Sequence, residues 1–81
     1  MNFKKIVKLK IIKIFYNYLY IALVIFTYEG LPLKVQCLKE DKMKDICNKY
    51  ISKINININS LYFLYGGNQI NLELTFKEQA N

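Results

Sequence analysis

The chain has 81 residues, of which 53% are hydrophobic, a net charge of +6, and no histidine or tryptophan. A chain this short forms one domain, and its apolar content is too high for a disordered tail. Without histidine, neither a Ser/His/Asp nor a Cys/His catalytic arrangement is possible. Residues 1–20 carry five Lys and no acid, whereas residues 21–81 carry seven Lys and six acids. A nucleic-acid-binding patch outside the N-terminal segment is therefore not expected.

Residues 3–28 are almost wholly apolar apart from Lys and Asn, and two interpretations of them remain open. In the first, residues 11–28 form a membrane anchor whose Lys-rich end stays in the cytosol. The strongest apolar run within it, residues 19–26, is eight residues long. A helix needs about 20 mostly apolar residues to span a bilayer. Lys13 and Asn17 also interrupt the stretch, so its length counts against this interpretation.

In the second interpretation, residues 1–19 are a basic hydrophobic extension, and residues 21–27 form the first strand of a folded domain. The β-branched and aromatic side chains of this run favour a strand, and the Glu29-Gly30 pair that follows is a turn signal. The extension could contact anionic lipid or act as a targeting segment. Residues 20–28 cannot be both a first strand and the middle of a membrane helix, so the two interpretations exclude each other.

A second strand and a helix follow. Residues 33–37 alternate apolar and polar side chains, which predicts a half-buried strand that pairs with residues 21–27 around Gly30. Asp41 is the expected N-cap of the helix, since its carboxylate suits the positive end of the helix dipole. One face of this helix carries an apolar stripe that we expect in the core: Met43, Ile46, Cys47, Tyr50, Ile51 and Ile54.

The remaining residues predict a connection and a second hairpin. The Asn-rich residues 54–60 predict an irregular connection whose Ile side chains pack under the sheet, because Asn favours turns over strands. Residues 61–65 form the next strand, Gly66-Gly67-Asn68 a tight turn, and residues 69–72 a short returning strand. This order predicts an α+β fold in which one helix packs on one face of a mixed sheet.

At this point the sequence resembles the ubiquitin-like β-grasp family. Thr27 and Glu29-Gly30 match the family's first hairpin turn, and Gly67-Asn68-Gln69-Ile70 is similar to its Gly-Lys-Gln-Leu turn. The helix stripe matches the family's core helix, and Thr75-Phe76 resembles a Thr-Leu pair in the loop beyond. The resemblance implies that residues 20–81 are a partial ubiquitin-like domain that follows the extension of residues 1–19.

The fold that the resemblance implies is truncated before the family's last strand, which normally lies between the first and third strands. Residues 21–27 and 61–65 would then have unpaired inner edges. We expect residues 4–18, a second copy of the chain, or residues missing from it to fill this place. Residues 6–11 alternate in polarity, so they could form a strand. A short connection would make its pairing with the next strand antiparallel, unlike the family's central pairing.

The resemblance also implies a protein partner that binds an exposed apolar patch on the sheet. Leu64 matches the central residue of this patch, Tyr28 lies at a flanking position, and Tyr62 is the third expected partner-binding residue. No Gly-Gly tail is present, so we expect a cytoplasmic, non-conjugated ubiquitin-like interaction module, or a fragment of one. Its unpaired strand edges could make it dimerise. The alternatives are a small single-pass membrane protein anchored by residues 11–28 and a truncated product without a function.

Catalytic, cofactor-binding and metal-binding residues are not expected. Cys37 and Cys47 are not spaced as zinc ligands, and we expect both to be buried, reduced thiols. Glu40, Asp41 and Asp45 lie at the start of the predicted helix, where capping explains them. The sequence therefore predicts neither enzymatic activity nor a bound cofactor, and no nucleic-acid partner.

Overall fold

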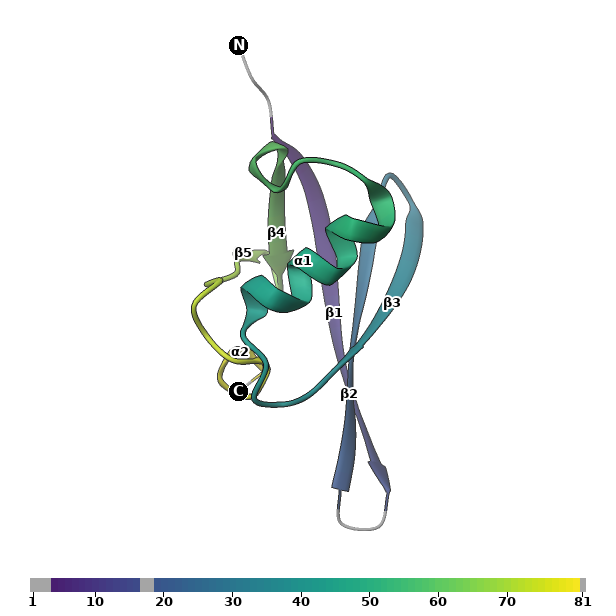
Figure 1. Cartoon of the computed structure of the whole chain (residues 1–81), viewed down its shortest axis with the longest axis vertical. Coiled ribbons are helices and arrows are strands. Elements are labelled where there is room, and N and C mark those ends of the chain that lie inside the picture. The colour runs from purple at the N-terminus through teal and green to yellow at the C-terminus, as the bar shows by residue number, and fades with distance from the viewer. Residues whose placement is uncertain (1–3, 17–18, 81) are drawn as a thin grey trace.

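The computed structural model describes residues 4–16 and 19–80, which form a small α+β domain with a five-stranded mixed sheet and two helices. The predictions that concern residues 1–3, 17, 18 and 81, as parts of the expected extension and of the end of the domain, lie outside the described residues. Figure 1 shows the elements in chain order: β1 (Lys5–Tyr16), β2 (Leu19–Tyr28), β3 (Leu31–Cys37), α1 (Met43–Ile54), the 3-10 turn η1 (Ile58–Ser60), β4 (Leu61–Tyr65), β5 (Asn68–Gln69) and α2 (Phe76–Gln79).

The sheet has the strand order β3-β2-β1-β4-β5, with β1 at its centre. β1 runs antiparallel to β2 and parallel to β4. The inner edges of β2 and β4, expected to lack a partner within the domain, are therefore both paired by β1. Of the three candidates for this place, the N-terminal segment fills it, and its pairing with β2 is antiparallel as its short connection requires.

The alternation of side chains explains why β1 can occupy a central position. Val7 and Leu9 are buried on one face of the sheet, whereas Lys8 and Lys10 are exposed on the other. Successive side chains of a strand point to opposite faces, so this pattern suits a sheet that is covered on one side. The lysines stay in water while the apolar side chains reach the core.

The predicted hairpin of β2 and β3 is confirmed. These strands pair antiparallel from Ala22–Cys37 to Tyr28–Leu31. Glu29 and Gly30 both have positive φ, 51° and 78°. Two successive residues with positive φ are characteristic of the tight hairpin turns that match strand twist, and glycine adopts this conformation without steric cost.

The predicted apolar stripe of α1 is also confirmed. Met43, Ile46, Cys47 and Tyr50 are buried against the sheet. The Tyr50 ring stacks on Phe26 of β2 with centroids 4.3 Å apart, and Phe63 of β4 meets both rings edge-on at 6.0 and 6.4 Å. Aromatic pairs favour stacked and edge-to-face geometries of this kind. This three-ring cluster joins α1 to the two strands that flank β1.

The expected N-cap role of Asp41 is wrong. α1 begins at Met43, and the residue at its N-cap, Lys42, makes no side-chain capping bond. Instead, the loop before α2 passes the helix start, where the Met43 N–H donates to the Leu74 carbonyl (2.7 Å) and the Lys44 N–H to the Leu72 carbonyl (2.9 Å). Backbone carbonyls of a distant segment thus satisfy donors that a capping side chain would otherwise satisfy.

The Asp41 carboxylate has a different local role. It accepts a hydrogen bond from the Leu38 N–H at 2.9 Å and lies 3.9 Å from the Lys49 ammonium. Asp41 therefore stabilises the turn between β3 and α1. An Asp side chain that bonds nearby backbone favours turns for the same reason that it favours N-caps, so the local sequence did not distinguish the two roles.

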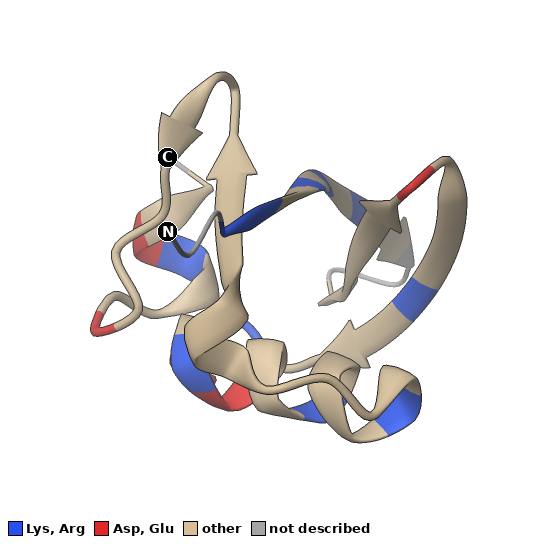
Figure 2. Cartoon of the chain, turned by 90° about the horizontal axis from the view of Figure 1, so that it is seen from above, with Lys and Arg blue, Asp and Glu red and all other residues tan. Residues whose placement is uncertain are grey.

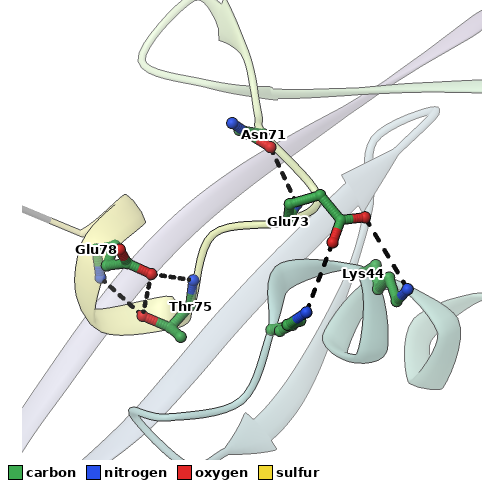
Figure 3. A network of polar contacts seen from close by, with 6 residues as sticks. Lys44, Asn71, Glu73, Thr75 and Glu78 are labelled. Atoms are coloured by element: carbon green, nitrogen blue, oxygen red, sulfur yellow. Dashed lines mark hydrogen bonds and ion pairs between the residues drawn. The ribbon is translucent and has the colours of Figure 1, made fainter.

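The C-terminal residues form a second, short helix, α2, which was not expected from the sequence. Thr75 and Glu78 make a capping box: the Glu78 N–H donates to Thr75 Oγ1, and the Thr75 N–H donates to the Glu78 carboxylate (Figure 3). These bonds to Thr75 lower the pKa of Glu78. The capping box fixes the start of α2. The first residue of this helix, Phe76, is fully buried and attaches it to the core.

The loop before α2 is also held by side chains. Glu73 lies 3.6 Å from the Lys42 ammonium and 3.9 Å from that of Lys44, and its N–H donates to the Asn71 side chain (Figure 3). The side chains of Lys42, Lys44 and Glu73 are about half exposed or more. Ion pairs between exposed side chains contribute little to stability. The backbone bonds to α1 are the stronger attachment.

The irregular connection after α1 is confirmed. α1 ends at Ile54, and the C-cap residue Asn55 has the left-handed φ of 56°. The Asn57 side chain accepts a hydrogen bond from the Asn59 N–H at the start of η1. Ile54, Ile56 and Ile58 are half-buried and pack against the core. The returning strand predicted for residues 69–72 is shorter than expected, because β5 spans only Asn68–Gln69.

Among the residues that the structure describes, no helix has both the length and the apolar character needed to cross a membrane. Residues 11–16 belong to β1 and residues 19–28 form β2. The segment that one interpretation of the sequence made a membrane anchor is residues 11–28. Its described residues belong to two antiparallel strands of the sheet.

Candidate interaction surface

The two faces of the sheet differ in what covers them. α1 crosses one face, and the sheet curves around it (Figures 1 and 2). The other face is covered by neither helix, and its side chains stay outside the hydrophobic core. We define this open face by its central residues: Ile6, Lys8, Lys10, Ile12, Leu23, Ile25, Lys34, Tyr62 and Leu64.

The strand register brings these residues into cross-strand pairs. Between β1 and β4, Ile6 lies opposite Tyr62 and Lys8 opposite Leu64. Further along β1, Lys10 lies opposite Ile25, and Ile12 lies opposite Leu23. Cross-strand neighbours of this kind have Cβ atoms roughly 5 Å apart. The apolar side chains therefore form two groups, one of Ile6, Tyr62 and Leu64 and one of Ile12, Leu23 and Ile25, and Lys8 and Lys10 lie between these groups on β1.

The charges on the open face are all positive. None of the strands contains an acidic residue, and the acid nearest to them in the chain is Glu29 in the turn after β2 (Figure 2). Within the described part of the chain, no ion pair involves Lys8, Lys10 or Lys34. The Lys4 ammonium lies 4.9 Å from the centre of the Tyr62 ring. The surface is therefore apolar with unneutralised lysines between the apolar side chains.

Two of the three expected partner-binding residues lie together on this face. Tyr62 is 39% exposed and Leu64 is half-buried, and both point away from α1, since the intervening Phe63 is buried in the core. They lie on β4, beside the central strand β1, and form the β4 side of the open face.

Tyr28 does not lie with them. It shares the inner face of β2 with Val24 and Phe26, and it packs against the core. The Lys5 ammonium, which pairs with Glu29 at 3.2 Å, lies 5.9 Å from the centre of its ring. The family-based match placed Tyr28 on the partner-binding side. Counting alternate residues from Phe26 along the same strand gives the correct side.

The residues of β1 are the part of the surface that the sequence analysis missed. Ile6 and Ile12 contribute apolar side chains, and Lys8 and Lys10 contribute the charges between them. The alternation of residues 6–11 was the available signal. It shows that a strand has two different faces, but it does not show which strands lie on either side of it.

The two cysteines are free, buried thiols, as expected. The Cys37 Sγ lies 3.7 Å from the Ala22 carbonyl, to which it donates a weak hydrogen bond. Burial raises the pKa of Cys37 to about 11 and that of Cys47 to about 12. Both side chains are therefore neutral thiols at neutral pH, and thiols are far weaker nucleophiles and metal ligands than thiolates.

The described residues contain no group of three or more His, Cys, Asp or Glu side chains placed to share a metal ion. A hollow of about 410 Å³ lies between η1, β4 and α1. It is lined by apolar and amide side chains together with the ammonium-bearing Lys4 and Lys44. This set of groups has no acid–base pair, and the open face remains the most distinctive surface of the molecule.

Comparison with known proteins gives no match: no protein-family model, no curated protein and no solved structure is significantly similar to this chain.

Proposed function

We propose that this protein is a non-conjugated ubiquitin-like interaction module that binds a protein partner through the open face of its sheet. The observation that carries the proposal is the pairing of Ile6 with Tyr62 and of Lys8 with Leu64 on a face that no helix covers. Partner-binding surfaces combine apolar and aromatic anchors with polar groups that set specificity.

The order of the elements supports the β-grasp part of the proposal. The hairpin of β2 and β3 is followed by α1, β4 and β5, and a strand lies between β2 and β4. In the family that central strand comes from the C-terminal end. Here it is β1, and it runs antiparallel to β2. The protein would thus reach a β-grasp arrangement of strands with one strand supplied from the other end of the chain and reversed.

The chemistry of the open face defines the partner. Ile6, Tyr62 and Leu64 would receive apolar side chains. Lys8, Lys10 and Lys34, which form no ion pair with any described residue, would attract carboxylates. We therefore propose a protein partner that presents an apolar segment flanked by Asp or Glu. Charges of this kind mainly accelerate association and select the partner, and the desolvated apolar anchors supply most of the affinity.

The test is binding of a captured partner by matched variants of the full chain. We expect Leu64→Ser and Tyr62→Ser each to raise the Kd for the partner by roughly tenfold or more, which is the usual effect of truncating an interface anchor. Leu38→Ser is the control, because Leu38 is 67% exposed but lies between β3 and α1, outside the open face. A partner that binds both open-face variants as tightly as the parent would refute the proposed surface.

A further inference from the structure

The hairpin of β1 and β2 extends beyond the rest of the sheet (Figure 1). Pairing of β1 with β4 ends at Leu9, and pairing of β2 with β3 begins at Ala22. Beyond these points the two strands pair only with each other, as in the Ile14–Ile21 and Phe15–Tyr20 pairs. We call residues 13–16 and 19–21 the hairpin arm.

The arm concentrates the exposed apolar side chains of the molecule. Phe15 is 73% exposed, Leu19 74%, Ile14 46% and Ile21 41%. These four are half of the eight large hydrophobic side chains that are exposed among the described residues. Scattered exposed apolar residues are normal, whereas a cluster at one end of a molecule marks a contact surface.

The apolar side chains of the arm point to both faces of the ribbon. Ile14 and Ile21 lie on the side of the open face, whereas Phe15 and Tyr20 lie on the other side with their rings 5.5 Å apart. A partner protein with an ordinary flat surface would cover one of these sides and leave the other in water. A lipid interface surrounds an inserted ribbon and covers both sides.

Lysines lie at and behind the base of the arm. Lys13 lies 5.9 Å from the centre of the Tyr20 ring, and Lys39 approaches the same ring at 5.7 Å. Lys10 lies three residues before Lys13 on β1 and is exposed on the open face. Residues 1–28 contain no acid, whereas Lys39 forms a solvent-exposed ion pair with Glu40 at 3.9 Å. A second copy of the chain would bring a second set of lysines to this end, which opposes self-association through the arm.

We propose that the hairpin arm inserts into the interfacial region of an anionic lipid bilayer. Phe15 and Leu19 enter the boundary between headgroups and acyl chains, and Lys10, Lys13 and Lys39 face the lipid phosphates and carboxylates. Three residues of strand at about 3.3 Å each extend about 10 Å, which suits the depth of roughly 5–10 Å to which interfacial segments penetrate. Lysines close to an anionic membrane surface each add to the attraction.

The experiment is co-sedimentation of the full chain with phosphatidylcholine vesicles, with and without phosphatidylserine. We expect binding to the phosphatidylserine vesicles that weakens as salt is raised, because salt screens charges at a membrane surface. Leu19→Ser and Phe15→Ser should each weaken vesicle binding by at least roughly tenfold, the loss of one buried apolar side chain. Both residues are mostly exposed, so the variants should keep the circular dichroism of the parent.

Matched controls distinguish binding through the arm from binding through any exposed apolar side chain or any lysine. Leu31 is 73% exposed but lies at the opposite end of β2 and β3, so Leu31→Ser should bind vesicles like the parent. Lys53→Glu on α1 should weaken binding much less than Lys13→Glu. Equal loss in Leu31→Ser and Leu19→Ser, or no binding to phosphatidylserine vesicles, would overturn the proposal.

The same variants distinguish this proposal from the open-face function. Leu64→Ser should leave vesicle binding unchanged, and Leu19→Ser should leave binding of the protein partner unchanged. If size-exclusion chromatography showed a dimer that Leu19→Ser converts into a monomer, with no vesicle binding in the parent, the arm would instead bind a second copy, and the lipid proposal would be wrong.

Discussion

Val7→Asp should abolish the folded state, whereas Ile6→Asp at the neighbouring position should leave the domain folded. Val7 is fully buried in the central strand, opposite Phe63 of β4. A carboxylate there would have no polar partner, and burying an unpaired charge costs several kcal/mol, a large share of the roughly 5–15 kcal/mol that stabilises a typical domain. The measurement is the dispersion of the proton–nitrogen NMR spectrum, with circular dichroism alongside.

Ile6→Asp is the matched control because it places the same charge one residue away on the open face, where Ile6 is 52% exposed. The two positions share the same local sequence and strand, and they differ in the face to which they point. A dispersed, parent-like spectrum for Val7→Asp would show that β1 is not packed in the core.

Tyr50→Ala should lower the free energy of unfolding by about 3–5 kcal/mol, the usual loss when a large buried aromatic side chain is removed. Tyr50 is 1% exposed, stacks on Phe26 and meets Phe63 edge-on. Its removal would leave a cavity at the point where α1 contacts both strands beside β1. Urea denaturation followed by circular dichroism measures the change, and a domain of this size could become largely unfolded.

Tyr50→Phe keeps the ring and is the control for this prediction. No hydrogen bond of the Tyr50 hydroxyl is found among the described residues, so the Phe variant should be close to the parent in stability. A loss below about 1 kcal/mol in Tyr50→Ala would contradict the packing of α1 on the sheet, since surface substitutions typically have effects of that size.

Elements defined by local pattern could be predicted from the sequence. The spacing of Met43, Ile46 and Tyr50 gave the buried face of α1, and the Glu29-Gly30 pair gave the turn between β2 and β3. Each of these features depends on periodicity or turn chemistry within a few residues, and that information is contained in the local sequence.

Features that depend on distant segments could not be predicted in the same way. The alternation of residues 6–11 indicated a strand but not its neighbours, because pairing with Leu61–Tyr65 joins segments more than fifty residues apart. The start of α1 is satisfied by carbonyls of Leu72 and Leu74 instead of by Asp41 for the same reason. The composition of the open face follows from the position of β1, so Ile6 and Lys8 were missed together with it.

The central claim is that β1 lies between β2 and β4, because both the core and the open face depend on it. The most direct test is the pattern of nuclear Overhauser effects between backbone protons of the full chain. We expect contacts between residues 5–9 and 61–65 in a parallel register and between residues 8–16 and 19–27 in an antiparallel register. Absence of the first set, or a helical pattern over residues 5–16, would contradict the account.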